Sequence, residues 1–138
     1  MYDSGTFKTI NPHYEGDCIP IYEIMGPEDI TILNNGIALI SSDNRRKTLE
    51  GESEQGGIYS YNLNQTSPNL VLLTNNINFE FHPHGISVYE KDNGEIKIMV
   101  INHRTNENTI EVFDFLENKL LFIKTIRDDL SNSPNDLI

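Results

Sequence analysis

The sequence of 138 residues contains no tryptophan and a single cysteine, Cys18. It has no apolar run near the roughly 18 residues that suggest a membrane-spanning helix. Basic residues are also scarce: 10 Lys and Arg stand against 21 Asp and Glu, for a formal net charge of −11. Because nucleic-acid affinity depends largely on Lys and Arg contacts to phosphates, this charge argues against a nucleic-acid partner.

Several short motifs of known chemistry are missing as well. The chain contains no G-x-S-x-G, no phosphate-binding P-loop and no G-x-G-x-x-G, so neither a Ser-His-Asp hydrolase nor a nucleotide-binding site is supported. Residues 1–18 are polar and lack the apolar segment of a signal peptide. In a secreted protein, the lone Cys18 would suggest a partner elsewhere, and Asn64 would begin a glycosylation sequon.

Alternating apolar and polar residues dominate the remainder of the chain and predict strands. Turn signals occur at residues 34–36, 92–94 and 117–118. The polar stretch at residues 44–56 reads as a loop, and no helix-length periodicity competes with the alternation. Eight strands in two groups of four are therefore expected, within residues 28–43, 56–64, 69–74, 84–103 and 108–126.

The two groups of strands align as a repeat. Glu28-Asp29-Ile30 opens the first group, His84-Gly85-Ile86 opens the second, and Asn135-Asp136-Leu137 stands where a third would open, at offsets of 56 and 51 residues. Four strands in roughly 40–50 residues are typical of a β-propeller blade, and propellers close with about 4–8 blades. We therefore expect an all-β, partial β-propeller of about two blades plus the start of a third. The alternative is an eight-stranded sandwich or barrel.

Polar residues recur at the start of each repeat, which in a propeller lies at the central channel. Carboxylates and amides that converge on one axis repel one another or remain unpaired unless a cation joins them. Calcium takes 6–8 oxygen ligands and tolerates irregular geometry, whereas zinc favours sulfur and nitrogen. Asp and Asn also favour turns and strand starts for local reasons, so the recurrence alone leaves both readings open. The residues concerned are Glu28, Asp29, His84, Asn135 and Asp136.

The histidines offer a second candidate site. His84 begins the first strand of its group and His103 ends the second, so an antiparallel hairpin brings them to the same end of the sheet. Such a pair suits proton transfer, since imidazole titrates near neutral pH. His82 shares a face with His84 in an extended segment and suggests a metal pair, while His13 reads as a surface residue. A histidine at a strand end is otherwise a hydrogen-bonded structural residue.

Four segments together resemble the serum paraoxonase/arylesterase family: "GPEDITILNNGIALISSD", "FHPHGISVY", "VINHRTNENTIEVFDF" and "KTIRDDL…PNDLI". They occur in order, with similar spacing, from about Cys18 to the last residue. The resemblance implies a six-bladed β-propeller with two calcium ions in its tunnel. It also implies that residues 18–138 are the N-terminal portion of a truncated propeller, with residues 1–17 a poorly defined extension and the remaining blades missing.

The resemblance assigns roles to individual residues. Glu28 and Asn135 match ligands of a catalytic calcium, and Asp29 and Asp136 match side-chain ligands of a structural calcium. A backbone carbonyl at Ile86 completes this set, and further ligands come from later blades of the family. His84 and His103 match the family's proposed histidine dyad. Cys18 matches a cysteine that forms a disulfide with one near the family's C-terminus.

The implied function is calcium-dependent hydrolysis of lactones and aryl esters, and in some members of phosphotriesters. Calcium would polarise the carbonyl, and His84, tuned by His103, would activate a water. The expected partner is a small-molecule lactone or ester. The resemblance also implies a secreted, glycosylated or membrane-associated protein that associates with membranes or lipoproteins. The isolated chain is expected to be inactive. One alternative is a non-catalytic propeller fragment that acts as a binding or structural module. Another is a gluconolactonase-like propeller hydrolase.

Overall fold

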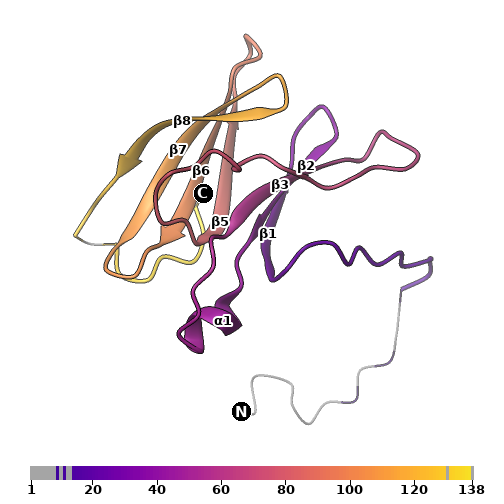
Figure 1. The fold of residues 1–138 in the computed structure, drawn as a ribbon. Coiled ribbons are helices and arrows are strands. Elements are labelled where there is room, and N and C mark those ends of the chain that lie inside the picture. Colours follow the sequence, from indigo (N-terminus) through magenta and orange to yellow (C-terminus); the bar gives the residue numbers. More distant parts are fainter. Residues whose placement is uncertain (1–8, 10, 12–13, 130, 138) are drawn as a thin grey trace.

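The computed structural model describes residues 9, 11, 14–129 and 131–137. Its strands form two separate four-stranded antiparallel sheets that lie side by side (Figure 1). Within the described residues the elements are β1 (Pro27–Ile32), β2 (Ile37–Ser42), α1 (Arg45–Leu49), β3 (Gly57–Asn62), β4 (Val71–Leu72), β5 (Pro83–Glu90), β6 (Ile96–His103), β7 (Asn108–Leu116) and β8 (Lys119–Ile126).

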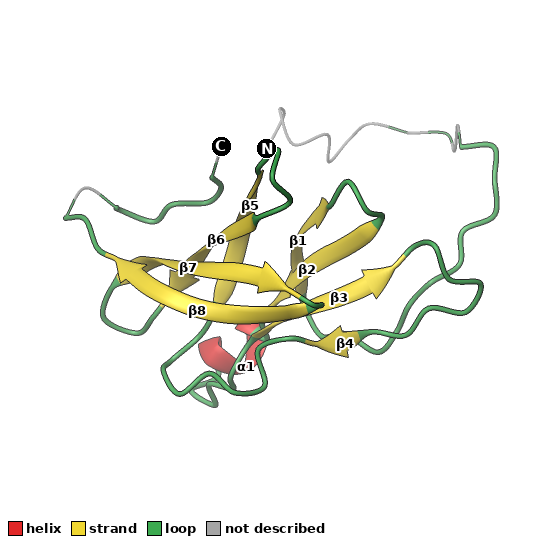
Figure 2. Ribbon diagram, turned by 90° about the horizontal axis from the view of Figure 1, so that it is seen from above, coloured by secondary structure: helices red, strands yellow, loops and turns green. Residues whose placement is uncertain are grey.

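Each sheet is a meander whose strands are neighbours in sequence order, β1-β2-β3-β4 and β5-β6-β7-β8. The innermost strands β1 and β5 contact each other, whereas β4 and β8 lie at the far edges of their sheets (Figure 2). Both β1 and β5 have an irregular register near their first residues, at Pro27–Asp29 and at Pro83–Ile86. This arrangement is that of two consecutive blades of a β-propeller, which confirms the predicted fold class.

The turns follow the predicted sequence signals. Gly36 and Gly94 adopt φ of 79° and 83° in the β1–β2 and β5–β6 connections, a conformation that L side chains rarely adopt. The two residues between β7 and β8, Glu117 and Asn118, also have positive φ, of 50° and 58°. Two consecutive left-handed residues form the type I′ turn that matches strand twist in a two-residue hairpin.

One stretch differs from its prediction. Residues 44–56, expected to be a loop, contain the short helix α1. Asn44 caps it by accepting from the backbone N–H of Lys47, and Thr48 N donates to the Asn44 carbonyl. Five residues are too few for the period of 3.6 to be visible in the sequence, so the pattern could not reveal this helix. No helix within the described residues is long and apolar enough to cross a membrane.

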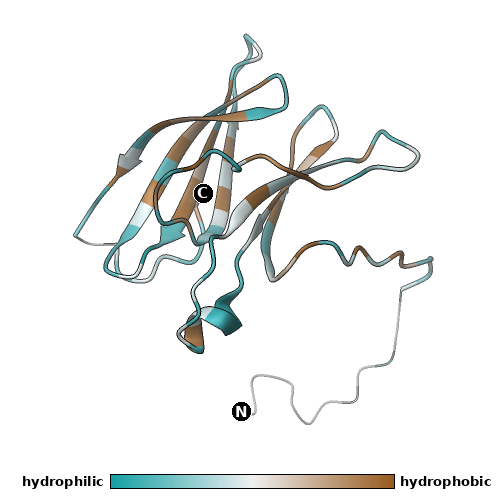
Figure 3. Ribbon diagram, viewed as in Figure 1, coloured by the Kyte–Doolittle hydropathy of each residue, from teal (hydrophilic) through white to brown (hydrophobic). Residues whose placement is uncertain are grey.

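The hydrophobic core joins the two blades. Leu39 and Ile58 of the first sheet, Val100 and Phe113 of the second, and Phe81 between them belong to one buried cluster. Figure 3 shows apolar residues along the strands of both sheets. Because the cluster spans both blades, it holds the starts of β1 and β5 beside each other. The residues that open the two repeats are thereby brought to one place.

Candidate functional site

The candidate site lies at the end of the two sheets where β1 and β5 begin and β6 ends. A hollow of about 460 Å³ opens there. Its walls come from the segment after β2, from α1, from the start of β5, from the end of β6 and from the last described residues. The side chains that line it include Asp43, Arg45, His82, His84, His103 and Asn135. Segments that are far apart in sequence therefore present charged and titratable groups to one space.

His84 and His103 meet at the edge of this hollow. Nδ1 of His84 lies 3.1 Å from Nε2 of His103, and the ring centroids are 5.2 Å apart. Their approach follows from the β5–β6 hairpin, in which Pro83 pairs with Asn102. Nδ1 of His103 lies 2.7 Å from Oδ1 of Asn108 at the start of β7, so the neighbouring strand fixes the ring.

His84 is also held by residues of the first blade. Its Nε2 lies 3.3 Å from Oε2 of Glu28, and its Nδ1 lies 2.9 Å from Nη2 of Arg45. A carboxylate only accepts and a guanidinium only donates, so this geometry favours Nε2–H as donor and Nδ1 as acceptor. Burial and the nearby Arg45 charge lower the pKa of His84 below its ordinary value, although Glu28 opposes them. The imidazole is therefore neutral near pH 7.

The guanidinium of Arg45 contacts both Glu28 and His84. Its Nε lies 3.1 Å from Oε1 of Glu28, while the same guanidinium contacts His84. Sequence reasoning did not identify Arg45, because the stretch that carries it read as a polar loop. The short helix α1 is what places its side chain at the hollow, and a run of charged residues alone gives no sign of this.

Oxygen-bearing groups converge at the start of β5. The Asp29 carboxylate accepts from the backbone N–H of Ile86 at 2.8 Å and from that of Ile30 at 2.8 Å. A Cβ added to Gly85 would lie 2.8 Å from the Asn135 carbonyl oxygen and 3.2 Å from Oδ1 of Asp136. Residues 135–137, expected to open a third group of strands, have no strand assignment, and Asn135 and Asp136 lie close to Gly85 at the start of β5.

These groups do not form a complete metal site. Among the residues that the structure describes, no three His, Cys, Asp or Glu side chains are gathered so as to hold an ion. What the structure brings together is a set of oxygen atoms from carboxylates and backbone carbonyls, which has the chemistry that calcium prefers. Glu28 meanwhile pairs with Arg45 and His84, apart from Asp29 on the adjacent position of β1.

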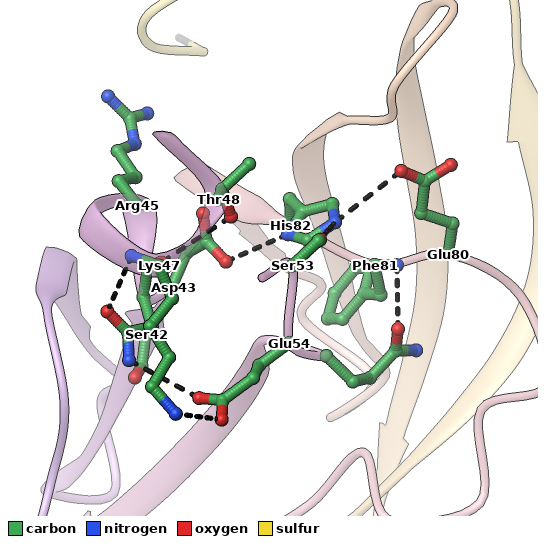
Figure 4. Close-up of polar contacts among 12 residues, drawn as sticks. Ser42, Asp43, Arg45, Lys47, Thr48, Ser53, Glu54, Glu80, Phe81 and His82 are labelled. Atoms are coloured by element: carbon green, nitrogen blue, oxygen red, sulfur yellow. Dashed lines mark hydrogen bonds and ion pairs between the residues drawn. The ribbon is translucent and has the colours of Figure 1, made fainter. Parts of the chain in front are cut away.

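His82 belongs to a different arrangement from His84. Its Nδ1 lies 2.9 Å from Oδ1 of Asp43, and its Nε2 lies 3.1 Å from Oγ of Ser53 (Figure 4). The sequence suggested His82 and His84 as a metal pair, but the structure gives each its own partners. His13 lies outside the described residues, and Cys18 is exposed.

Comparison with known proteins identifies the family. The model of the family described as Arylesterase matches residues 12–138. The chain belongs to the arylesterase family. It is 38% identical over 120 residues to serum paraoxonase/arylesterase 2 of Gallus gallus, covering 82% of this chain and 34% of that protein. It is 32% identical over 139 residues to serum paraoxonase/lactonase 3 of Homo sapiens, covering 95% of this chain and 39% of that protein.

The extent of these matches matters for the site. The chain spans little more than a third of the length of the curated arylesterase relatives it matches, such as 40% of serum paraoxonase/arylesterase 1 of Mus musculus. Two blades and the segment of residues 131–137 contribute the site residues described above. The family resemblance predicted from four motifs is confirmed.

Proposed function

We propose that the protein containing this chain is a calcium-dependent hydrolase of lactones and aryl esters. The observation that carries the proposal is the contact between His84 and His103 at a hollow that Asn135 also lines, with Glu28 paired to His84. Membership of the arylesterase family supports the reaction class, since the names of its relatives include arylesterase and lactonase. Phosphotriesters remain a secondary substrate class of the same proposal.

Calcium is proposed on the chemistry of the donors. Glu28 and Asn135 would hold one ion, and Asp29, Asp136 and the Ile86 carbonyl would hold a second. Support comes from the oxygen-only donor set and from the close approach of residues 135–136 to Gly85. When bound, calcium polarises an ester carbonyl and stabilises the negative charge that develops on its oxygen.

The protein's own groups would move the proton. His84 is the proposed general base, because its lowered pKa keeps the ring neutral and able to accept a proton from water at neutral pH. His103 would orient this ring and share the proton through the contact between Nδ1 and Nε2. Asn108 would hold His103 in place during the transfer. Arg45 would keep the resting His84 neutral by its adjacent positive charge.

The test is hydrolysis by the full-length protein before and after calcium removal. We expect a chelator to abolish the hydrolysis of an aryl acetate and of a γ-lactone, and added calcium to restore both. Full hydrolysis in the presence of excess chelator would refute calcium dependence. Hydrolysis that is absent in the calcium-loaded, folded protein would refute the proposed activity and favour a binding or supporting role for the propeller.

Further properties are proposed from the same family relation. Residues 18–138 would form the first part of a longer propeller, completed by blades from the rest of the protein. An extracellular location is supported by relatives that are named serum paraoxonases. In that location Cys18, which is exposed, would be available for a disulfide with a cysteine outside this chain, and Asn64, also exposed, for a glycan. Lipid or lipoprotein association belongs to this proposal too.

A further inference from the structure

A second group of chemically active side chains lies at one side of the hollow, separate from the His84/His103 pair. Asp43 follows β2, Ser53 lies in the segment between α1 and β3, and His82 precedes β5. The three meet through His82, with Asp43 on Nδ1 and Ser53 on Nε2 (Figure 4). They are 10 and 29 residues apart in the chain, and no sequence motif connects them.

The tautomer of His82 follows from its partners. A carboxylate accepts but does not donate, so the contact of 2.9 Å with Asp43 places a proton on Nδ1 of the imidazole. In the neutral ring Nε2 then carries the lone pair, and the Ser53 hydroxyl, 3.1 Å away, donates to it. A hydroxyl, a base and a carboxylate that orients the base are the parts of an activated nucleophile.

Burial distinguishes the members of this group. The side chains of His82 and Asp43 are each only 6% exposed, whereas Ser53 is exposed. Removal from water strengthens the attraction between the Asp43 carboxylate and an imidazolium ion. The Glu80 carboxylate lies 3.5 Å from Nε2 of His82 and places a second negative charge beside the ring. The base is therefore sheltered and the hydroxyl accessible.

Hydrogen bonds and an ion pair hold the segments that carry His82 and Ser53 in place. The His82 backbone donates to Oδ1 of Asn102 at 2.7 Å, and its carbonyl accepts from His103 N at 3.0 Å. Two residues beyond Ser53, the Gln55 side chain bonds the backbone of Phe79 and Phe81, at 2.6 and 3.2 Å. Glu54 forms an ion pair with Lys47 of α1. The hydroxyl and the base are thus positioned before any ligand arrives.

We propose that Ser53 is a nucleophile that accepts the acyl group of activated carboxylic esters. His82 acts as its general base, and Asp43 is a positioning residue for His82. In the step, the Ser53 oxygen forms a bond to the carbonyl carbon and the bond to the leaving oxygen breaks. The hydroxyl proton passes to Nε2 of His82 and from there to the leaving alkoxide. The products are an alcohol and a Ser53 ester, which water hydrolyses to a carboxylic acid.

The test uses the full-length protein and a fluorophosphonate probe, whose phosphorus bonds to the serine oxygen as fluoride leaves. Peptide mass spectrometry locates the adduct in the calcium-loaded protein, with the probe in excess so that hydrolysis of part of it does not limit labelling. We expect one adduct per chain on Ser53 and none in Ser53→Ala. The matched control is Ser67→Ala, since Ser67 is another exposed serine; this variant is expected to keep the adduct and its rate.

Two further variants test the base. His82→Gln is expected to slow labelling of Ser53 by about 10²-fold or more, the usual range of general-base catalysis. Asp43→Asn is expected to slow labelling, because an amide does not fix the proton on Nδ1 of His82 as a carboxylate does, and Asp43→Glu, which keeps a carboxylate, is expected to restore part of the rate. If His82→Gln does not fold, the labelling rates of the two Asp43 variants and the Ser53 adduct still test the proposal. Three results would each overturn the proposal. They are labelling spread equally over exposed serines, no adduct on Ser53, and a labelling rate that is unchanged in the His82 and Asp43 variants.

Discussion

His82 and His84 are separated by one proline, yet the residues of the first blade that contact them differ in charge and in hydrogen bonding. Arg45 and Glu28 face His84, and burial with the Arg45 charge lowers its pKa. Asp43 and Ser53 face His82, a carboxylate on one ring nitrogen and a hydroxyl on the other. One imidazole is therefore kept neutral beside a cation, and the other is oriented by an anion. These four partners of the histidines lie 29 to 56 positions earlier in the chain.

The largest expected effect separates the two histidines by activity. His84→Gln in the full-length protein should lower calcium-dependent lactone hydrolysis by about 10²-fold or more, because it removes the proposed base. The same variant should retain fluorophosphonate labelling of Ser53, since His82 keeps its own partners. Steady-state hydrolysis and labelling rates measure the two effects. Equal loss of both would show that the two groups act as one site.

The Asn102 side chain supports the backbone at His82, and removing it should destabilise this part of the second blade. This buried side chain accepts from His82 N at 2.7 Å and donates to the Glu80 carbonyl at 2.9 Å and to Glu111 Oε1 at 3.0 Å. Asn102→Ala leaves those groups without partners, at a cost of about 3 kcal/mol. Urea unfolding measures the loss. A change below about 1 kcal/mol would mean that relaxation or water replaces the three bonds.

Glu111 accepts a hydrogen bond from Asn102 and makes the stability of the second blade depend on pH. Burial raises the pKa of this carboxyl, but hydrogen bonds from Thr125, Asn102, Thr109 and Arg104 outweigh it, so the pKa lies below its ordinary value. A carboxyl with a lowered pKa stabilises the fold above its unfolded pKa and loses that stabilisation as pH falls through the folded value.

Glu111→Gln should therefore cost about 2 kcal/mol at pH 7, because it weakens the bond from the Arg104 guanidinium. The difference from the unmodified protein should shrink as the pH falls below about 4.3, where an unfolded glutamate takes up its proton. Thermal unfolding at a series of pH values between 3 and 7 measures it. A difference that stays constant over this range would exclude Glu111 as a source of the acid sensitivity.

The fold could be predicted from the sequence because local features, namely turn residues and alternating strands, define the repeat. Turn residues at Gly36, Gly94 and Asn118 and the alternating strands are short-range signals, and each keeps its meaning whatever the rest of the chain does. The meeting of His84 and His103 was predictable for the same reason, as it needs only one antiparallel hairpin.

The remaining site residues depend on contacts between blades and could not be predicted in this way. Arg45 reaches His84 from a helix of five residues, too short to show a period. Asp43 and Ser53 reach His82 from two further segments, so their meeting requires the packing of β2 and the α1–β3 connection against the start of β5. The calcium ligands, placed by resemblance, stay a prediction.

The smallest expected effect, that of Gly85→Ala, distinguishes the proposed calcium sites from the Ser53–His82 group. A Cβ at Gly85 would lie 2.8 Å from the Asn135 carbonyl oxygen and 2.8 Å from the Asp136 Cα, closer than such atoms approach. Gly85→Ala should push residues 135–136 away, at a cost of about 1 kcal/mol. It should weaken calcium binding at least tenfold, since two proposed ligands move, while Ser53 labelling stays unchanged. Calorimetric calcium titration measures the first effect. Unchanged affinity in Gly85→Ala would separate residues 135–136 from the proposed metal sites and leave the carboxylates of β1 to account for calcium binding.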